Sequence, residues 1–502
     1  MPDVTGKVYL VGGGPGDPGL LTVRGRECLA RADVVLYDYL VNPLILAHAR
    51  PKAERVCLGR HGRDRIMPQQ EINAHLVRHA RAGRTVVRLK GGDPIVFAHA
   101  AEETAALVEA GVPYEIVPGI TAALAVGSYA GIPLTQGDAA SAVALVTGQE
   151  RRGKPSELNY KALAAFPGTL VFYMGVTTAK DWTAKLIAAG KPADTPAAIV
   201  RRCSLPDQVT ISCTLARVAD EIAERKLRPP ALVVVGSVAA TQVGRDWFTT
   251  RPLFGVRVLV TRAAGQAETL AATLSDLGAD VPVQPAIEIG PPDDWQPVDE
   301  AIARLEQFDW IVFSSGNGVR AFLGRLFRSR DARALGAVKL AAIGPASAEE
   351  LARHHLQADV VPDEYRAEAL AEALQQEAAA GKRFLLVRAS RGREVLAEEL
   401  TAAGGSVEQV VAYTSRDAQA ADELVAEQLR AGEIDWITVT SSAIARSLAQ
   451  LFGDELRNAR LASISPVTSA TLGELGYDVA AEASAYTMEG LVDAILHAQR
   501  EA

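Results

Sequence analysis

Four glycine-rich turns in the first half of this 502-residue chain are well suited to hold a ligand. Each follows a short apolar run, and glycine lets a ligand come close to the backbone. In the first turn, Pro15 and Pro18 remove backbone donors, so the turn is a poor cradle for a dinucleotide. We therefore predict a cleft assembled from several loops that binds another kind of ligand. The turns are GGGPGDPG from Gly12 to Gly19, Gly91-Gly92-Asp93-Pro94, PGITAA from Pro118 to Ala123, and YMGVT around Met174.

Small hydroxyl residues follow apolar runs in the second half of the chain. Beside backbone N–H groups, such residues suit the recognition of carboxylate or phosphate groups. The same residue types also cap helices, and for any single serine or threonine that alternative stays open. The groups are Ser314-Ser315-Gly316, Thr440-Ser441-Ser442 and Pro466-Val467-Thr468.

The elements that must position these turns alternate along the whole chain. Short β-branched runs such as VYLVG, TLVFYMG and DWIVFSS alternate with Ala- and Leu-rich helical patterns, which predicts an α/β fold with mainly parallel sheets. The alternation breaks in VGRDWFTTRPLFG, residues 243–255. We therefore expect one unit over residues 1–243, a linker over 244–254 and a second unit over 255–502.

The second unit contains an internal duplication. Three pairs of segments match with a nearly constant offset, which is typical of a repeated structural unit. We therefore predict two similar α/β lobes with a cleft between them, in which the loops after the strands carry the ligand site. The matching segments begin at Gly255 and Gly381, at Phe308 and Ile434, and at Leu340 and Leu461, with offsets of 126, 126 and 121 residues.

Composition and charge exclude several classes of protein. Hydrophobic residues make up 48% and charged residues 22% of the chain, as in ordinary globular proteins. Residues 51–100 hold ten Lys or Arg against four Asp or Glu, which suits a polyanion or a solvated helix face, but no aromatic residues interleave as nucleic-acid binding requires. Without a secretory pattern or ~18 consecutive apolar residues, the protein is expected to be soluble and cytoplasmic. The cysteines lack metal-ligand spacing and are interpreted as reduced packing residues: Cys28, Cys57, Cys203 and Cys213.

The motifs of the first unit form an ordered set: VGGGPGDPGLLTVRG, YDYLVNP, Gln70-Glu71-Ile72-Asn73, RLKGGDPIVF, VPGITAA, GIPLT, YMG and TPAAIV. Over about residues 5–243, this set resembles the uroporphyrinogen-III C-methyltransferase family. The resemblance implies the tetrapyrrole-methylase fold, with two α/β domains and S-adenosylmethionine bound in the cleft between them. By motif, it assigns cofactor contacts to Pro15, Gly91, Gly92, Asp93, Val96, Thr121, Ala122, Met174 and the backbone at Cys203.

Asp38, in YDYLV, matches the proton acceptor proposed for that family, and methylation of a pyrrole carbon requires the loss of a proton. The alternative is a loop carboxylate that caps a helix. Arg60 stands where the family has a lysine assigned as proton donor. A guanidinium binds a carboxylate but hardly releases a proton, so we interpret Arg60 as a substrate ligand. Three other departures bear mainly on substrate placement: Ala98-His99-Ala100-Ala101 for GRGG, Gln136-Gly137 for a His-Arg pair, and Cys203 for a glycine.

The second unit carries RVLVTR, DWIVFSSGNGVRAF, AAIGP, VVAYTS and SPVTSATL, and through them resembles uroporphyrinogen-III synthase. The resemblance implies closure of linear hydroxymethylbilane to uroporphyrinogen III, with inversion of ring D and without a cofactor. Loss of hydroxide needs an acid, and Tyr413 in VVAYTS matches that family's candidate. A half-buried packing aromatic is the alternative for Tyr413. Ser315, Ser441 and Thr468 are expected to bind substrate carboxylates.

Both implied reactions handle the same eight-carboxylate macrocycle. Together they predict a bifunctional enzyme that makes uroporphyrinogen III and methylates it to precorrin-2, the branch compound towards sirohaem and cobalamin. The expected partners are small tetrapyrrole substrates rather than nucleic acid or membrane, with a homodimer through the methyltransferase unit as one expected assembly. Two alternatives stay open: a methyltransferase for another substrate, such as a later corrin intermediate or a modified histidine, and a second unit that is a non-catalytic bilobal binding module.

Overall fold

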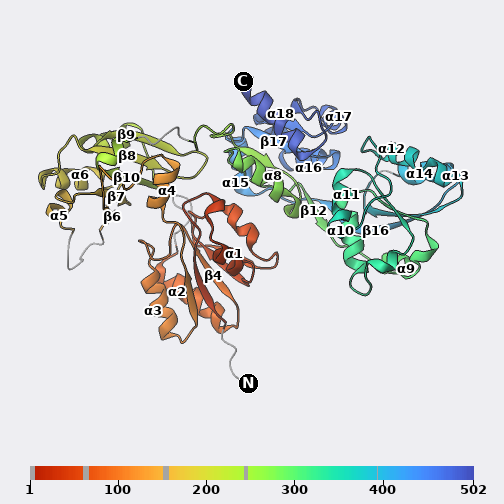
Figure 1. The fold of residues 1–502 in the computed structure, drawn as a ribbon, viewed down its shortest axis with the longest axis horizontal. Coiled ribbons are helices and arrows are strands. Elements are labelled where there is room, and N and C mark those ends of the chain that lie inside the picture. Colours follow the sequence, from red (N-terminus) through yellow and green to blue (C-terminus); the bar gives the residue numbers. More distant parts are fainter. Residues whose placement is uncertain (1–5, 60–66, 151–157, 242–246, 393, 502) are drawn as a thin grey trace. The chain divides into compact units, whose positions relative to one another are not determined.

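The computed structural model describes residues 6–59, 67–150, 158–241, 247–392 and 394–501. The chain divides into two compact units, coloured mainly red to yellow and green to blue in Figure 1. The first unit is Met1–Val256 with Leu277–Asp280, and the second is Arg257–Asp276 with Val281–Ala502. None of the helices in the described ranges is long and apolar enough to cross a bilayer.

The first sheet of unit 1 is parallel, with strand order β3-β2-β4-β1-β5. Its central strands are apolar and β-branched, and β4 is buried along its whole length although it contains Arg88 and Lys90. Helices α1, α2 and α3 pack with this sheet. The elements are β1 (Val8–Gly12), η1 (Pro18–Leu20), α1 (Val23–Leu29), β2 (Val34–Tyr37), η2 (Pro43–His48), β3 (Glu54–Cys57), α2 (Gln69–Arg81), β4 (Val86–Lys90), α3 (Ala100–Glu109) and β5 (Tyr114–Val117).

The second sheet of unit 1 is mixed, with strand order β6-β7-β10-β8-β9. Only β6 and β7 pair in parallel, so this sheet departs from the expected parallel pattern because β8, β9 and β10 pair antiparallel. Phe172 stacks on Trp182 in its core. The elements are α4 (Ala122–Tyr129), β6 (Val143–Thr147), α5 (Tyr160–Ala164), β7 (Thr169–Tyr173), α6 (Ala179–Ala188), β8 (Pro196–Arg201), β9 (Val209–Thr214), η3 (Leu215–Arg217), α7 (Val218–Glu224), β10 (Ala231–Val235) and η4 (Ser237–Ala240).

The segment expected to be a linker packs against the first unit where the structure describes it. Phe248 is fully buried in the same hydrophobic cluster as Tyr129, and the two rings meet edge to face. The Trp247 indole donates a hydrogen bond of 2.9 Å to the Ser128 carbonyl. Residues 247–254 are therefore a packed extension of this unit rather than a free tether, because their aromatic side chains bury apolar surface there.

The described residues of unit 2 form two sheets. One is parallel, with order β11-β17-β18-β19, and the other has order β12-β16-β15-β13-β14, in which only β12 runs antiparallel. The elements of the first lobe are β11 (Val258–Val260), α8 (Ala264–Asp276), α15 (Glu423–Arg430), β17 (Trp436–Val439), α16 (Ser442–Phe452), η7 (Gly453–Asn458), β18 (Arg460–Ser463), α17 (Pro466–Glu474), β19 (Val479–Glu482) and α18 (Met488–Arg500). Those of the second lobe are β12 (Ile287–Gly290), α9 (Gln296–Ala303), η5 (Leu305–Gln307), β13 (Trp310–Phe313), α10 (Gly316–Leu326), η6 (Ala332–Leu335), β14 (Lys339–Ala342), α11 (Pro345–Ala352), α12 (Ala367–Ala373), α13 (Gln375–Ala379), β15 (Arg383–Ala389), α14 (Val395–Ala402) and β16 (Ser406–Asp417).

Each lobe is assembled from both sequence repeats. In the first lobe, β11 of the first repeat pairs with β17 of the second, with Val258 opposite Trp436. In the second lobe, β15 of the second repeat pairs with β13 of the first, with Phe384 opposite Trp310. The two pairings are equivalent, because an offset of 126 converts one into the other. The duplication thus gives two similar lobes that exchange their first strands, an arrangement that the sequence repeat alone did not indicate.

Candidate active sites

The loops that follow β1, β4 and β5 in unit 1 interlock through their glycines. Gly14 and Gly92 exchange backbone hydrogen bonds of 3.2 and 2.7 Å. A Cβ atom on Gly119 would lie 2.3 Å from the Gly92 carbonyl oxygen and 2.7 Å from the Gly12 Cα. These separations leave no room for any side chain, so the three turns form one rigid backbone surface at the carboxyl edge of the sheet.

Asp93 fastens two of these turns together. Its Oδ1 accepts the Ile95 N–H at 2.9 Å, and its Oδ2 accepts the Gly119 N–H at 3.0 Å. The side chain is buried. The sequence predicted that Asp93 would hold polar atoms of a cofactor, whereas in the structure its two oxygens first satisfy the backbone of neighbouring loops.

An exposed apolar surface lies beside the glycine turns. Met174 is 47% exposed and has a left-handed backbone with φ of 52°, and Phe97 is exposed with φ of 54°. The Phe97 ring lies 5.1 Å from the ring of Tyr173, whose hydroxyl accepts the Ala123 N–H and bonds to Thr121 Oγ1 at 2.7 Å. Left-handed backbone costs energy in residues with a side chain and is often found at binding sites. Tyr173 and Phe97 were not among the predicted residues.

The first glycine turn also contacts the part of unit 1 that contains its second, mixed sheet. The Asp17 N–H donates to Ser204 Oγ at 3.1 Å, and the Tyr129 hydroxyl donates to Asp17 Oδ2 at 2.7 Å. Cys203, next to Ser204, is buried, and burial raises the pKa of its thiol to about 12, so the thiol is unreactive. The remaining predicted cofactor residues are half-buried in these loops: Pro15, Gly91, Gly92, Val96 and Ala122.

Asp38 belongs to a buried network of charges. Its Oδ1 lies 2.6 Å from Nη2 of Arg88, whose Nε lies 3.0 Å from Oε1 of Glu103. Lys90 Nζ reaches both oxygens of Glu103 at 2.9 Å. Arg88, Lys90 and Glu103 are almost fully buried, whereas the Asp38 side chain is 31% exposed. Asp38 is therefore the carboxylate through which this network meets solvent.

Arg88 and Lys90, two of the cations in residues 51–100, do not form the polyanion site that was considered above. Both side chains are buried and paired with carboxylates. Burial lowers the pKa of Lys90, and repulsion by Arg88 lowers it further, while Glu103 acts in the opposite direction.

Arg60 lies outside the described residues, so the structure does not place it. Of the other departures, His99 is exposed just before α3, with φ of 56°, and Gln136 pairs with Ala140 in an exposed turn.

In unit 2, the structure brings Tyr413 and Ser315 together. Tyr413 lies on β16 and Ser315 precedes α10, and their hydroxyl oxygens are 2.9 Å apart. Tyr413 is 8% exposed. Burial raises the pKa of its hydroxyl, while hydrogen bonds from Ser315 and Asn317 partly offset that effect. A phenol keeps its proton at neutral pH, so this hydroxyl has a proton to donate, and the two hydrogen bonds counteract the loss of acidity that burial causes.

Ser441 and Thr468 lie in the other lobe of unit 2. Ser441 caps α16, because its Oγ accepts the Ile444 N–H at 3.2 Å. Thr468 is 2% exposed and bonds to Ser465, which is the residue that caps α17. Ser315 and Ser441 therefore both cap helices, as the alternative interpretation of these residues expected. The buried Thr468 hydroxyl bonds to the residue that caps its own helix.

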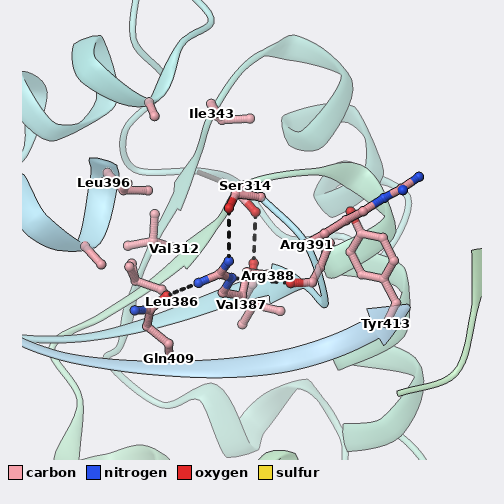
Figure 2. Close-up of a pocket in the computed structure, with 14 residues that line it drawn as sticks. Val312, Ser314, Ile343, Leu386, Val387, Arg388, Arg391, Leu396, Gln409 and Tyr413 are labelled. Carbon is pink, nitrogen blue, oxygen red and sulfur yellow. Dashed lines mark hydrogen bonds between the residues drawn. The ribbon is translucent and has the colours of Figure 1, made fainter. Parts of the chain in front are cut away.

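Two arginines of unit 2 have buried nitrogen atoms that lack a hydrogen-bond partner among the described residues, namely Arg262 Nε and Arg391 Nη2. Arg391 lines a cavity of about 230 Å³ together with Arg388 and Tyr413. Figure 2 shows Tyr413 and Arg391 on one side of this cavity and the apolar Leu396 and Val312 on the other. An unpaired guanidinium nitrogen suits a carboxylate. Sequence reasoning missed both arginines, although they follow the matching segments RVLVT and FLLVRAS.

Comparisons with known proteins match both halves of the chain. A family of tetrapyrrole (corrin/porphyrin) methylases matches residues 7–219, and the family described as uroporphyrinogen-III synthase HemD matches residues 268–493. Porphyrin biosynthesis protein HemD of Ruminiclostridium josui is 33% identical over 439 residues, which cover 87% of each chain. A uroporphyrinogen-III C-methyltransferase of Bacillus subtilis strain 168 is 39% identical over 71% of this chain and 74% of its own. A crystal structure of uroporphyrin-III C-methyl transferase from Thermus thermophilus, complexed with S-adenyl homocysteine, is 41% identical, covers 47% of this chain and 99% of its own, and has a TM-score of 0.41.

Proposed function

This chain belongs to the family of porphyrin biosynthesis protein HemD and uroporphyrinogen-III C-methyltransferase, and from that membership we propose how its two units work. The chain is a bifunctional enzyme of tetrapyrrole biosynthesis. Its first unit is an S-adenosylmethionine-dependent methyltransferase and its second is a uroporphyrinogen-III synthase. The observation that carries this conclusion is the match of a methylase family and a synthase family to successive halves of one chain.

The loops of unit 1 fit S-adenosylmethionine, a ligand with both polar and apolar parts. The interlocked glycines offer a backbone surface, and Met174 offers exposed apolar surface beside it. Bound there, the cofactor supplies an electrophilic methyl group. The residues that hold it are Pro15, Gly91, Gly92, Val96, Thr121, Ala122, Met174 and the backbone at Cys203, with Asp93 fixing the loops.

Asp38 is the base that takes the proton that the substrate loses once a pyrrole carbon has gained a methyl group. Every pyrrole carbon of the eight-carboxylate macrocycle already carries a substituent, so the methylated ring is left cationic with a quaternary carbon. A C–H bond of an adjoining methylene bridge then breaks, its electrons form a C=C bond that neutralises the ring, and the carboxylate accepts the proton. Its support is the partial exposure of Asp38 at the edge of a buried network, where Arg88 fixes the carboxylate from behind. Arg60 remains the predicted ligand for a substrate carboxylate.

Tyr413 is the acid of the synthase reaction. The C–O bond of the hydroxymethyl group breaks, and the departing oxygen takes the phenol proton and leaves as water. The pyrrole ring attacked during closure later loses a proton, and that proton restores the phenol. The support for this role is the position of the hydroxyl, which is buried, contacts Ser315 and lies at the lining of two cavities. Ser315, Ser441 and Thr468 stay candidates for carboxylate binding through their loops. Arg391 is a further one, because its Nη2 has no hydrogen-bond partner among the described residues although its Nη1 pairs with Asp417.

The two activities reside in separable parts of the chain, with a boundary near residue 250, because each part carries its own motifs. We also propose a homodimer through the methyltransferase unit, which light scattering of that unit would test, and a cytoplasmic location. The location is supported by the four cysteines, which are all unpaired.

A coupled assay tests the function directly. The purified chain receives hydroxymethylbilane and S-adenosylmethionine, and mass spectrometry follows the products. We expect uroporphyrinogen III and then a product heavier by two methyl groups. Conversion of the bilane without methylation would overturn the substrate assigned to unit 1. Methylation of supplied uroporphyrinogen III without closure of the bilane would make unit 2 a binding module instead.

A further inference from the structure

A groove along α10 of unit 2 is not used by any role assigned above. Its volume is about 320 Å³, near the lower end of the ~300–1,000 Å³ that is typical of ligand pockets. It can therefore hold part of a tetrapyrrole but not the whole macrocycle. The groove is lined by α10, the end of β12 and the segment before α9, elements that are labelled in Figure 1. Its lining includes Trp295, Asn317, Arg320, Gly324, Arg328 and Tyr413.

The floor of the groove is one face of α10. Asn317, Ala321 and Gly324 follow one another at intervals of four and three residues, which places them on one side of the helix, and Arg328 lies in the turn just beyond its end. A Cβ atom added at Gly324 would meet no other atom within 4 Å. The small residues in the middle of this face therefore leave open space.

Positive charge is concentrated around the groove. Arg320 lies 2.8 Å from Glu350, but that carboxylate is shared with Arg353 at 2.8 Å. The guanidinium of Arg328 is exposed and has no ion pair or hydrogen bond among the described residues. This excess stands out because residues 251–502 carry 23 Lys or Arg against 37 Asp or Glu. The groove therefore favours a carboxylate-bearing ligand over a neutral one.

One wall of the groove is aromatic and fixed. Arg325 forms an ion pair of 2.5 Å with Asp299, and its guanidinium lies 4.9 Å from the centre of the Trp295 ring. This contact holds Trp295 in place, and its ring offers a flat surface to another ring. Tyr413 also lines the groove, and its hydroxyl neighbours Asn317 at the start of α10. From there to Leu326, the last residue of α10, the helix axis spans about 14 Å, and Arg328 lies two residues further along the chain.

We propose that this groove binds one end of the linear tetrapyrrole substrate, namely the pyrrole rings next to the carbon that loses hydroxide. The rings lie over Ala321 and Gly324 beside Trp295, and their carboxylate arms pair with Arg320 and Arg328. This places the hydroxymethyl carbon at the end of the groove that Tyr413 lines. The inference rests on the proposed synthase function, to which it adds a substrate subsite.

Filling the groove tests the inference. Gly324→Met places a long side chain in the open space, and methionine favours a helix more than glycine does, so Tm should not fall. We expect the KM for hydroxymethylbilane to rise about tenfold or more, with kcat changed less than about twofold, because the lost contacts serve binding rather than the chemical step. Arg328→Gln should raise KM by about threefold to tenfold. The matched controls are Gly473→Met, an exposed glycine on α17 that also has open space, and Arg333→Gln, whose partner is Asp331.

Titration with a bilane that lacks the terminal hydroxyl separates this inference from the proposed function. Followed by tryptophan fluorescence of the full chain, this unreactive bilane should bind the wild type and bind Gly324→Met about tenfold more weakly. A wild type that closes the bilane, together with variants whose KM and Kd are unchanged, would overturn the groove but leave the synthase function intact. A higher KM of the variants for supplied uroporphyrinogen III in the methyltransferase assay would also overturn it. A wild type that neither binds nor closes the bilane would overturn both.

Discussion

The two candidate sites of this chain are built from different parts of the polypeptide. In unit 1 the ligand surface is backbone, where the loops after β1, β4 and β5 meet so closely that a Cβ at Gly119 would lie 2.3 Å from a carbonyl oxygen. In unit 2 the site consists of side chains, with Tyr413 and Ser315 in contact and buried nitrogens of Arg262 and Arg391 left without described partners. The first site is thus fixed before a ligand binds, whereas the second leaves donors for the ligand to satisfy.

This difference explains why the motifs of the two units differ in length. A backbone surface needs glycine at each close contact, so its sequence is a long run of restricted residues. A site made of hydroxyls and guanidiniums can place the same donors from several positions, so its motifs are short. The charges of the two sites differ in the same way. In unit 1, Glu103 and Asp38 neutralise Arg88 and Lys90 inside the protein. In unit 2, by contrast, buried nitrogens of Arg262 and Arg391 have no described partner.

The largest effect is expected from a single methyl group in the backbone site. Gly119→Ala forces the turns after β1 and β4 apart, and displacements of about 1 Å at a reacting centre cost roughly 100-fold in rate or more. We expect S-adenosylmethionine binding, measured by calorimetry, and methyl transfer both to be lost. Gly137→Ala is the control, since its added Cβ meets no atom within 4 Å. Full methyl transfer by Gly119→Ala would refute the rigid backbone surface, and synthase activity should be unchanged in both variants.

Asp38→Asn should separate cofactor binding from chemistry in unit 1. The amide keeps the size of the carboxylate but accepts a proton poorly, so methyl transfer should fall by roughly 10²–10⁴-fold. Calorimetry should show unchanged S-adenosylmethionine binding, because Asp38 contacts Arg88 rather than the glycine turns. Asp181→Asn, on an exposed ion pair with Lys185, is the control. Turnover within twofold of the wild type would remove Asp38 from the mechanism.

Tyr413→Phe tests the side-chain site. Loss of the hydroxyl should lower synthase turnover by roughly 100-fold and leave methylation of supplied uroporphyrinogen III unchanged. Stability should fall by only about 1 kcal/mol, the usual contribution of one hydrogen bond. Tyr477→Phe is a matched control, because Tyr477 is equally buried and its hydroxyl donates to the Gly453 carbonyl at 3.1 Å. If both variants close the bilane at the parental rate, Tyr413 is a packing residue.

The smallest effect concerns the stability of unit 1 in acid. His79 is buried, and its Nδ1 accepts a hydrogen bond of 3.0 Å from Arg84. Burial lowers the pKa of His79 below its ordinary value of 6.5, Glu54 partly offsets that effect, and the neighbouring Arg78 and Arg84 lower the pKa further. The unfolded chain therefore binds this proton more readily, so the stabilisation is complete above pH 6.5 and declines as the pH falls below it. Thermal unfolding of unit 1 should give a lower Tm at pH 5.5 than at pH 7.5.

His79→Gln should reduce that difference between the two pH values, because the titrating ring is gone. His48→Gln, at an exposed histidine of the same unit, should retain it. An unchanged pH dependence in His79→Gln would assign the acid sensitivity to other groups.

Much of the first site could be predicted from sequence because its function lies in the backbone. Glycine, proline and turn residues restrict the backbone locally, so four successive turns already indicated one cleft. The charged network could not be predicted, because Asp38, Arg88 and Glu103 are far apart in the chain and each has an ordinary surface interpretation. Lys90 and Arg88 did alternate within an apolar strand, and that pattern is a usable sign of buried charge. In unit 2, Asn317, Arg320 and Gly324 were missed for a similar reason, since only folding shows which helix face remains uncovered.

By itself, the sequence determined the α/β class, the glycine turns and the two repeats of the second unit, because each depends on residue type and local spacing. Only the tertiary structure decided that the repeats exchange their first strands, so that β11 pairs with β17 and β15 with β13. The reason is physical. The two repeats present nearly the same pairing edge, so the local pattern fits a partner strand in either repeat. Which of the two is used depends on how the connecting segments pass between the lobes, and that is a property of the whole folded chain.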